Sequence, residues 1–390
     1  MDPTLSPLAR GLRAGLDSDT AFSSIVPPIY LGTNFAFETL HSTPQYDYTR
    51  SGNPTRDLLG EGIATLEGGA EGIITSSGLS ALMLCFTALV PASGRIIAPH
   101  DCYGGTWRLL QYLAETGHFT VDHVDQTDPQ ALTEALQHPT DLVLIETPSN
   151  PLLRPTDLAT TVEKVHAAGA LALADNTFCS PLRQRPIKFG TDIVVHSTTK
   201  FINGHSDAVG GALVAADAQV GEKLKLWANV LGITASAFDS WLVLRGLRTL
   251  DARVRIHDAN AAEIVELLVT HPATTTVHYP GLANHPGHEI AARQQTSFGS
   301  MISFEVVGGL AGVEAFCHGL RIFDIAESLG GVESLVAHPA TMTHASMPHE
   351  VQLAAGITPA LLRLSVGIEP IADLLADIRD GLERVLKVGR

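Results

Sequence analysis

A regular alternation of two patterns runs through the middle of the chain, from about residue 61 to residue 215. Short apolar runs rich in β-branched residues, such as 142–146 and 192–196, alternate with stretches that have the apolar spacing of an amphipathic helix. Strands that alternate with helices predict a mainly parallel sheet covered by helices on both faces. The alternation therefore places the chain in the α/β fold class.

The pattern also divides the chain. Strands are predicted at 72–77, 94–100, 119–125, 141–149, 170–178, 192–199 and 208–216, and helices at 78–90, 105–116, 129–137 and 157–169. Residues 236–270 predict one long helical link, and strands at 300–308 and 361–369 with a helix at 371–387 predict a smaller α/β unit. We therefore expect a large domain over 61–255 and a C-terminal domain over 256–390, preceded by an irregular but apolar arm over 1–60.

Composition limits the partners. The 41 acidic and 25 basic residues give a formal charge of -16, which disfavours nucleic acid and anionic membranes as ligands. The cysteines form no CxxC pair, which disfavours a zinc ribbon or a disulfide framework and favours a reducing cytoplasm; they are Cys85, Cys102, Cys179 and Cys317. Neither a signal peptide nor a membrane-spanning stretch is predicted. We expect small-molecule substrates.

Polar side chains follow the predicted strands. They are Ser76–Gly78, His100–Asp101, Asp125, Glu146–Thr147, Asp175–Asn176 and His196–Lys200. In an open parallel sheet, ligands bind in the crevice beyond the carboxyl ends of the strands. These residues are therefore predicted to gather along one rim, although strand ends are polar in any α/β protein.

Three features of this rim make chemical sense together. Ser77, Gly78 and Leu79 open a helix directly after a strand, so free backbone N–H groups form an anion site that suits a phosphate. Asp175 ends an apolar run, where a buried carboxylate needs a cationic partner such as a protonated ring nitrogen. Taken separately, the first feature is common in α/β proteins and the second also fits a helix cap or a turn.

Lys200 is the third feature. It ends a buried-looking strand beside Ser197 and Thr199, whose hydroxyls suit a phosphate. A lysine able to form a Schiff base, an acid for a pyridinium nitrogen and a phosphate cup together match pyridoxal 5'-phosphate (PLP). A lysine that simply leaves the core for solvent is the alternative. Nucleotide-binding motifs of the GxGxxG and GxxxxGK[ST] types are absent.

Seven motifs carry a family resemblance across essentially the whole chain. In chain order they are YDYTRSGNPTR, HDCYGGTWR, ETPSNPLL, ADNTFCSP, HSTTKFINGHSD, IAESLGGVESL and LLRLSVGIE. They resemble the Cys/Met metabolism family of PLP-dependent enzymes. The resemblance implies the type I fold of PLP-dependent transferases, which is similar to that of aspartate aminotransferase, and a homotetramer built from two active dimers.

The resemblance also implies residue roles. Lys200 holds PLP and moves protons between substrate carbons, Asp175 pairs with the pyridinium nitrogen, and Tyr103 stacks on the ring. Gly78, Leu79, Ser197 and Thr199 hold the phosphate, joined by Tyr48 and Arg50 from a neighbouring subunit.

Further roles concern the substrate. Arg363 clamps the substrate carboxylate, with Asn150 and Ser328 nearby, and Glu327 receives the amino group of the cysteine or cystathionine arm. We expect cationic neighbours to leave Tyr103 partly ionised, so that it can accept a proton.

The implied reaction is γ-replacement. The cysteine sulfur displaces succinate or acetate from the γ-carbon of O-succinyl- or O-acetyl-L-homoserine and gives L-cystathionine, a step of transsulfuration in methionine biosynthesis. Ser51 stands where members with this activity often carry a second arginine, so Arg108 is the candidate for holding a distal carboxylate. Cleavage of cystathionine at the γ-carbon and PLP binding without turnover stay open as alternatives.

A metal site is disfavoured. His278, His285 and His288 are close in the sequence, but they follow the surface pattern of the family.

Overall fold

A seven-stranded sheet forms the large unit of the computed structural model, which describes residues 4–388. In spatial order its strands are β1 (Glu71–Thr75), β7 (Gly211–Ala215), β6 (Ile193–Ser197), β5 (Leu171–Asp175), β4 (Leu142–Glu146), β2 (Gly94–Pro99) and β3 (Phe119–Val124). Only β7 runs antiparallel to its neighbours. The predicted α/β fold class and mainly parallel sheet are confirmed.

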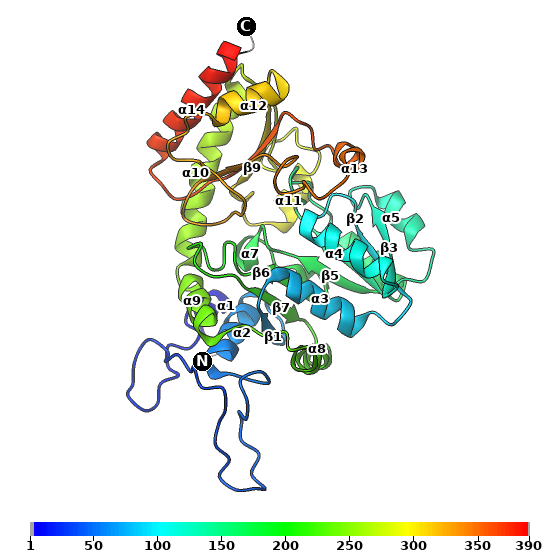
Figure 1. Cartoon of the computed structure of the whole chain (residues 1–390), viewed down its shortest axis with the longest axis vertical. Helices are drawn as coiled ribbons and strands as arrows, with labels where there is room; N and C mark the ends of the chain where they lie inside the picture. Colours follow the sequence, from blue (N-terminus) through cyan, green and yellow to red (C-terminus); the bar gives the residue numbers. More distant parts are fainter. Residues whose placement is uncertain (1–3, 389–390) are drawn as a thin grey trace.

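Helices cover both faces of this sheet (Figure 1). They are α2 (Pro54–Glu67), α3 (Gly78–Leu89), α4 (Gly104–Glu115), α5 (Pro129–Ala135), α6 (Leu158–Ala167), α7 (Ser180–Arg183), α8 (Ala218–Leu231) and α9 (Ala237–Leu247), with the 3₁₀ turn η1 (Pro186–Phe189). Successive strand residues enter different cores: Val194 packs with Leu59 of α2, and Val195 packs with Phe86 of α3. Because side chains alternate along a strand, both faces of β6 are apolar and buried.

A five-stranded sheet forms the C-terminal unit, in the order β10 (Asp324–Ile325), β11 (Leu335–Ala337), β12 (Leu361–Ser365), β9 (Met301–Val306) and β8 (Thr274–His278). Its helices are α10 (Leu250–Thr270), α11 (His288–Gln294), α12 (Gly309–Cys317), α13 (His349–Ala354) and α14 (Ile371–Val388). The long helix α10 leads from the large unit into this second one, and α14 packs against α12 (Figure 1). The predicted smaller α/β unit is therefore present.

Two segments differ from the sequence prediction. The expected single helical link is two helices, α9 and α10, because the helix breaks at Arg248 and Thr249. The last part of the predicted arm belongs to α2, whose apolar face packs on β1 and β7. The proposed domain limits at 60/61 and 255/256 thus fall inside α2 and α10, and the domain division stays a prediction.

The chain before α2 holds the short helix α1 (Pro7–Leu12) and then long loops that project from the body (Figure 1). Large apolar side chains on these loops are exposed, among them Phe22 at 89% and Leu40 at 98%. Over residues 4–388, none of the helices combines the length and the apolar character that a membrane crossing demands.

Candidate active site

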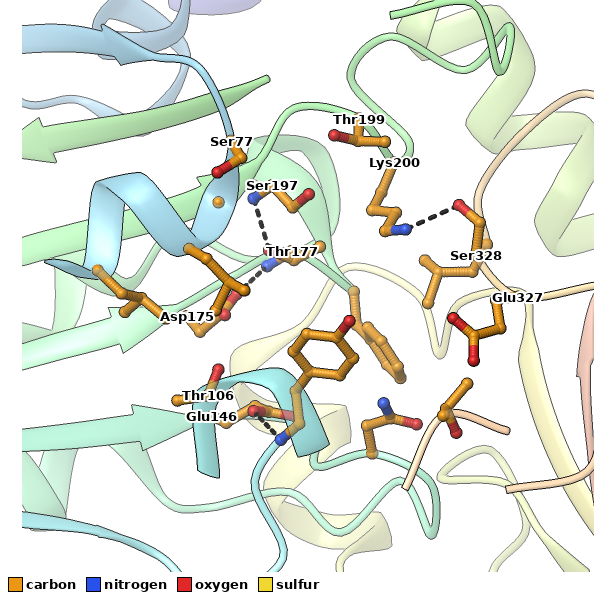
Figure 2. A pocket seen from close by; sticks show the side chains of 18 of the residues that line it. Ser77, Thr106, Glu146, Asp175, Thr177, Ser197, Thr199, Lys200, Glu327 and Ser328 are labelled. Atoms are coloured by element: carbon orange, nitrogen blue, oxygen red, sulfur yellow. Dashed lines mark hydrogen bonds between the residues drawn. The ribbon is translucent and has the colours of Figure 1, made fainter. Parts of the chain in front are cut away.

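A cavity of about 350 Å³ lies where the carboxyl ends of the large sheet meet the C-terminal unit. Eleven of the residues predicted from the sequence line it: Gly78, Leu79, Tyr103, Asn150, Asp175, Ser197, Thr199, Lys200, Glu327, Ser328 and Arg363. Figure 2 shows several of these side chains pointing toward one space from different elements. The predicted convergence at the rim is therefore present for these residues, whereas His100, Asp101 and Asp125 do not line the cavity. The C-terminal unit supplies part of the wall.

Lys200 stands in the turn that follows β6. Its Nζ donates a hydrogen bond of 2.7 Å to the Oγ of Ser328 (Figure 2). Burial, helped by the positive charge of Arg363, lowers the pKa of this lysine to about 8, against a smaller opposing effect of Glu327. The amine is therefore a good nucleophile and base near neutral pH, as the predicted Schiff-base role requires.

Asp175 is the last residue of β5 and lines the cavity. Its Oδ1 accepts the backbone N–H of Thr177 at 2.9 Å. Burial raises the pKa of its carboxyl, while the hydrogen bonds from Thr177 and the charge of His196 favour the ionised form. A cationic ring nitrogen placed against this carboxylate would supply the partner that the cavity itself lacks.

The start of α3 forms a cradle for an anion. The Oγ of Ser77 accepts the backbone N–H of Ser80 at 3.1 Å and so caps the helix, which leaves the amides of Gly78 and Leu79 free. A Cβ on Gly78 would approach the Cβ of Ser197 to 3.0 Å, so only glycine lets the helix start pack this close to β6. With Thr199 also at the cavity wall, these groups suit a phosphate.

Arg363 is provided by β12 and is almost fully buried. Its Nη1 donates to the Oδ1 of Asn150 at 2.9 Å, and its Nη2 donates to the carbonyl oxygen of Ser328 at 3.0 Å. Its Nε is buried without a partner in the described chain. Burial lowers the pKa of Arg363 to about 10, so a carboxylate ligand would both neutralise the charge and use the free donor.

Ser328 accepts hydrogen bonds from both Lys200 and Arg363, and its backbone conformation is strained. Its hydroxyl accepts from Lys200 and its carbonyl oxygen accepts from Arg363, with a φ of 96° that non-glycine residues seldom adopt. Such strain is kept where the surrounding contacts over-determine a functional geometry.

The expectation that Tyr103 is partly ionised stays a prediction, and the surroundings of its phenol in this chain oppose it. Burial raises the pKa of its phenol, and the nearby Glu327 carboxylate adds to that rise. Arg108 and Arg363 act in the opposite direction and do not outweigh these effects. Arg108 is itself exposed and does not line the cavity, so its role toward a distal carboxylate stays a prediction.

Tyr48 and Arg50 lie outside this cavity, on the exposed arm. The Nη1 of Arg50 donates to both the backbone oxygen and the Oδ1 of Asn229, each at 2.7 Å. Their predicted place in a neighbouring subunit's site is compatible with this exposure and is taken up below.

Some cavity residues were not assigned from the sequence. They are Glu146, Thr106, Thr177 and Thr343, with Leu82, Pro148, Phe178, Val209 and Leu329, whereas Ser77 was expected at the anion site. Glu146 had a signal, since it ends a predicted strand at the polar rim. Thr343 had none, because it belongs to a loop of the C-terminal unit that only the packing of the two units brings to the cavity.

A buried network of polar side chains holds the ends of β4, β5 and β6 in place. The Oε1 of Glu67 accepts from the Nδ2 of Asn176 at 2.8 Å and contacts the Nε2 of His196 at 2.6 Å. The Nε2 of Gln184 donates to the backbone oxygen of Thr147 at 3.1 Å and to the Oδ1 of Asn176 at 3.1 Å. Each network residue on a strand end neighbours a cavity residue in the chain, so the network fixes the ends of β4, β5 and β6.

Within the described part of the chain, no three His, Cys, Asp or Glu side chains are grouped in a way that would hold a metal ion. By contrast, the cavity offers a lysine with a lowered pKa, a carboxylate without a cation, an anion cradle and a buried arginine with a free donor. These groups fit the amine-reactive aldehyde, ring nitrogen and phosphate of PLP and the carboxylate of an amino-acid substrate.

Comparison with known proteins agrees with this chemistry. A family model described as Cys/Met metabolism PLP-dependent enzyme matches residues 9–383. The chain is 47% identical over 376 residues to a cystathionine γ-synthase of Escherichia coli K12, covering 96% of this chain and 97% of the relative. It is 44% identical over 374 residues to a cystathionine β-lyase of Lactococcus lactis MG1363, covering 96% and 98%.

A solved structure gives the same picture. It is a cystathionine γ-synthase from Xanthomonas oryzae pv. oryzae in complex with cystathionine, with a TM-score of 0.98 and 56% sequence identity over 99% of this chain and 100% of that chain.

Proposed function

Because the chain belongs to the Cys/Met metabolism family of PLP-dependent enzymes, we infer that it is a cystathionine γ-synthase. The sulfur of cysteine replaces the acyloxy group at the γ-carbon of O-succinyl- or O-acetyl-L-homoserine, so succinate or acetate leaves and L-cystathionine is the product. The observation that carries this inference is the similarity, over nearly the whole chain, to a synthase whose structure holds cystathionine. This similarity agrees with the cavity, whose groups suit PLP and an amino acid.

PLP, when bound, supplies an electron sink that makes the carbon next to the substrate amine acidic. Lys200 holds the cofactor before the substrate arrives. Once displaced, its amine would be partly unprotonated near neutral pH because burial lowers its pKa to about 8, and its hydrogen bond to Ser328 holds it at the cavity. The Lys200 amine would take a proton from the α-carbon, pass that proton on so that the amine is free again, and then take a proton from the β-carbon, whose electron pair expels the γ-substituent as a carboxylate.

The remaining groups orient the substrate and the cofactor and neutralise their charges. Arg363 binds the α-carboxylate, with Asn150 and Ser328 fixing the guanidinium in place. When PLP is bound, Asp175 would keep its ring nitrogen protonated, and the start of α3 with Ser197 and Thr199 would hold its phosphate. Tyr103 would cover the cofactor ring, and burial, which raises its pKa, favours the neutral phenol. Glu327 receives the amino group of the incoming cysteine.

We place the enzyme in the cytoplasm as a homotetramer of two active dimers. The exposed apolar side chains of the N-terminal arm need a cover that a second copy can provide. In such a dimer, Tyr48 and Arg50 of one subunit complete the phosphate site of the other.

The decisive assay supplies O-succinylhomoserine or O-acetylhomoserine with cysteine and, separately, cystathionine alone. Formation of cystathionine from the first mixture supports the synthase. The chain is also over 40% identical to cystathionine lyases, so rapid release of cysteine and 2-oxobutanoate from cystathionine, without synthesis, would assign it to that activity instead. Lys200→Ala should abolish both reactions.

Subunit mixing tests the shared site. Lys200→Ala and Arg50→Leu chains should each be inactive alone. A mixed dimer recovers one intact cavity only if Arg50 serves the neighbouring subunit, because both defects then fall in the other cavity. Absence of recovered activity in mixed dimers, with the oligomer verified by light scattering, would place Arg50 outside the shared site.

A further inference from the structure

Glu146 is a buried carboxyl at the cavity that has no assigned role. It is the last residue of β4, it is only 7% exposed, and it lines the same cavity as Lys200 and Asp175. Its Oε2 accepts the backbone N–H of Tyr103 at 2.9 Å, the hydrogen bond that ends on Glu146 in Figure 2. We propose that Glu146 is a positioning residue, which fixes the main chain of Tyr103 and so holds the Tyr103 ring over the cavity. The proposal rests on the inferred PLP-dependent function.

The ring of Tyr103 depends on its main chain for its position. Its side chain is 41% exposed, so neighbouring side chains leave much of the ring uncovered. One edge of the ring lies against Gly105, where a Cβ would meet the ring Cε1 at 2.5 Å. Because Tyr103 is partly exposed at the cavity, a shift of its backbone would move the ring across the cavity.

The main chain of Tyr103 is held at two points. Its carbonyl oxygen accepts the N–H of Trp107 at 2.9 Å, the first hydrogen bond of α4. Its own N–H donates to Glu146. Tyr103 is the N-cap of α4 but caps it with no side-chain hydrogen bond, so the Glu146 carboxyl ties the start of α4 to the end of β4. Loss of the hydrogen bond from Tyr103 to Glu146 would therefore remove one of the two hydrogen bonds that hold this main chain.

Glu146 accepts the Tyr103 N–H through a carboxyl oxygen, and this hydrogen bond does not require a negative charge on Glu146. Its neighbour across the parallel ladder is Asp175, and Asp101 is also close, so two other carboxyls oppose its ionisation. Burial together with these charges raises the pKa of Glu146 well above its usual range. Burial and the two neighbouring carboxyls therefore favour the neutral form of Glu146. A neutral carboxyl offers one acceptor and one donor, which glutamine reproduces.

The substitutions follow from this difference. Glu146→Gln keeps the shape and an acceptor, whereas Glu146→Leu keeps bulk and removes the acceptor. Asp141→Leu is the matched control: Asp141 precedes the same strand at its other end, where its Oδ2 accepts the backbone N–H of Arg95 at 2.8 Å. The two carboxyls are about 16 Å apart along the strand, so the control removes a comparable hydrogen bond away from the cavity.

Each variant is loaded with PLP and compared with the wild-type holoenzyme. The measurements are the visible circular dichroism of the bound cofactor, its dissociation constant, the melting temperature, and kcat and KM for synthesis. Glu146→Leu should weaken the dichroic band and lower kcat about 10- to 100-fold, since small displacements at a reacting centre have effects of that order. Glu146→Gln should keep the band and hold kcat within about threefold. Asp141→Leu should lower only the melting temperature.

The proposal is overturned if Glu146→Leu leaves both the band and kcat at wild-type values, or if Glu146→Gln is as impaired as Glu146→Leu. If Glu146→Leu does not fold, Glu146→Asp takes its place: it keeps the acid but draws the oxygen away from Tyr103, so it should be more impaired than Glu146→Gln. The reverse order would refute the proposal. A wild-type protein that shows no bound-cofactor band would instead refute the inferred function, so the two failures are distinct.

Discussion

The pKa of Lys200 predicts how the cofactor-free chain takes up PLP as the pH changes. An amine attacks an aldehyde only as the free base. Burial and the charge of Arg363 bring the pKa of Lys200 from 10.5 down to about 8, which means that the cavity favours the neutral amine. The perturbation to apply is therefore pH, followed by removal of the charges that act on this lysine.

The magnitude follows from the two pKa values. At pH 7 a lysine with a pKa of 10.5 is about 0.03% free base, and one with a pKa of about 8 is about 9% free base. The cavity therefore raises the reactive fraction about 300-fold, equivalent to about 3 kcal/mol. Between pH 7 and pH 8 the uptake rate should rise about fivefold and then level off above pH 9, whereas an ordinary lysine would gain about tenfold per pH unit up to pH 10.

The assay mixes cofactor-free protein with excess PLP from pH 6 to pH 10 and follows the absorbance of the bound cofactor. Lys200→Ala measures the background from other lysines. Removal of the Arg363 charge by Arg363→Gln should move the midpoint to higher pH, and Glu327→Gln should move it to lower pH. Comparing variants cancels the ionisations of PLP itself. A rate that climbs tenfold per unit to pH 10, or a midpoint that neither substitution moves, would refute the reasoning.

Three further outcomes follow from the structure. Arg363→Lys should raise KM for the homoserine ester about 10- to 100-fold with little change in the cofactor spectrum, because a point charge replaces a two-pronged donor; steady-state kinetics checks this. Asp175→Asn should retain bound PLP but lower kcat at least about 100-fold, since the ring nitrogen loses its negative partner; absorbance and turnover are measured together, and turnover equal to wild type would contradict the assigned role. Asp377→Ala should destabilise the fold by about 3 kcal/mol in urea, because the backbone N–H groups of residues 321–323 lose their buried acceptor; an unchanged cofactor spectrum is the control.

The strand and helix pattern was accessible from the sequence because it rests on local periodicity. The runs around 142–146 and 193–197 are apolar on both faces, and a fully buried parallel strand requires this. Polar residues at the ends of these strands indicated the rim, since the carboxyl ends of parallel strands share one edge. The helix α2 was missed because its glycines and polar residues blur the apolar spacing, and packing on β1 stabilises it instead.

By itself the sequence determined the fold class, the rim and the group of residues that suits PLP, because each depends on residue type and short spacing. Tertiary structure alone decided how those residues behave. Arg363, on β12 of the C-terminal sheet, donates a hydrogen bond to Asn150 in the loop after β4, and burial raises the pKa of Tyr103 against the effect of its cationic neighbours. Glu146 is tied to Tyr103 by a contact between residues 43 positions apart. Burial, distance and charge between remote segments are properties of the packed chain, and no local pattern encodes them.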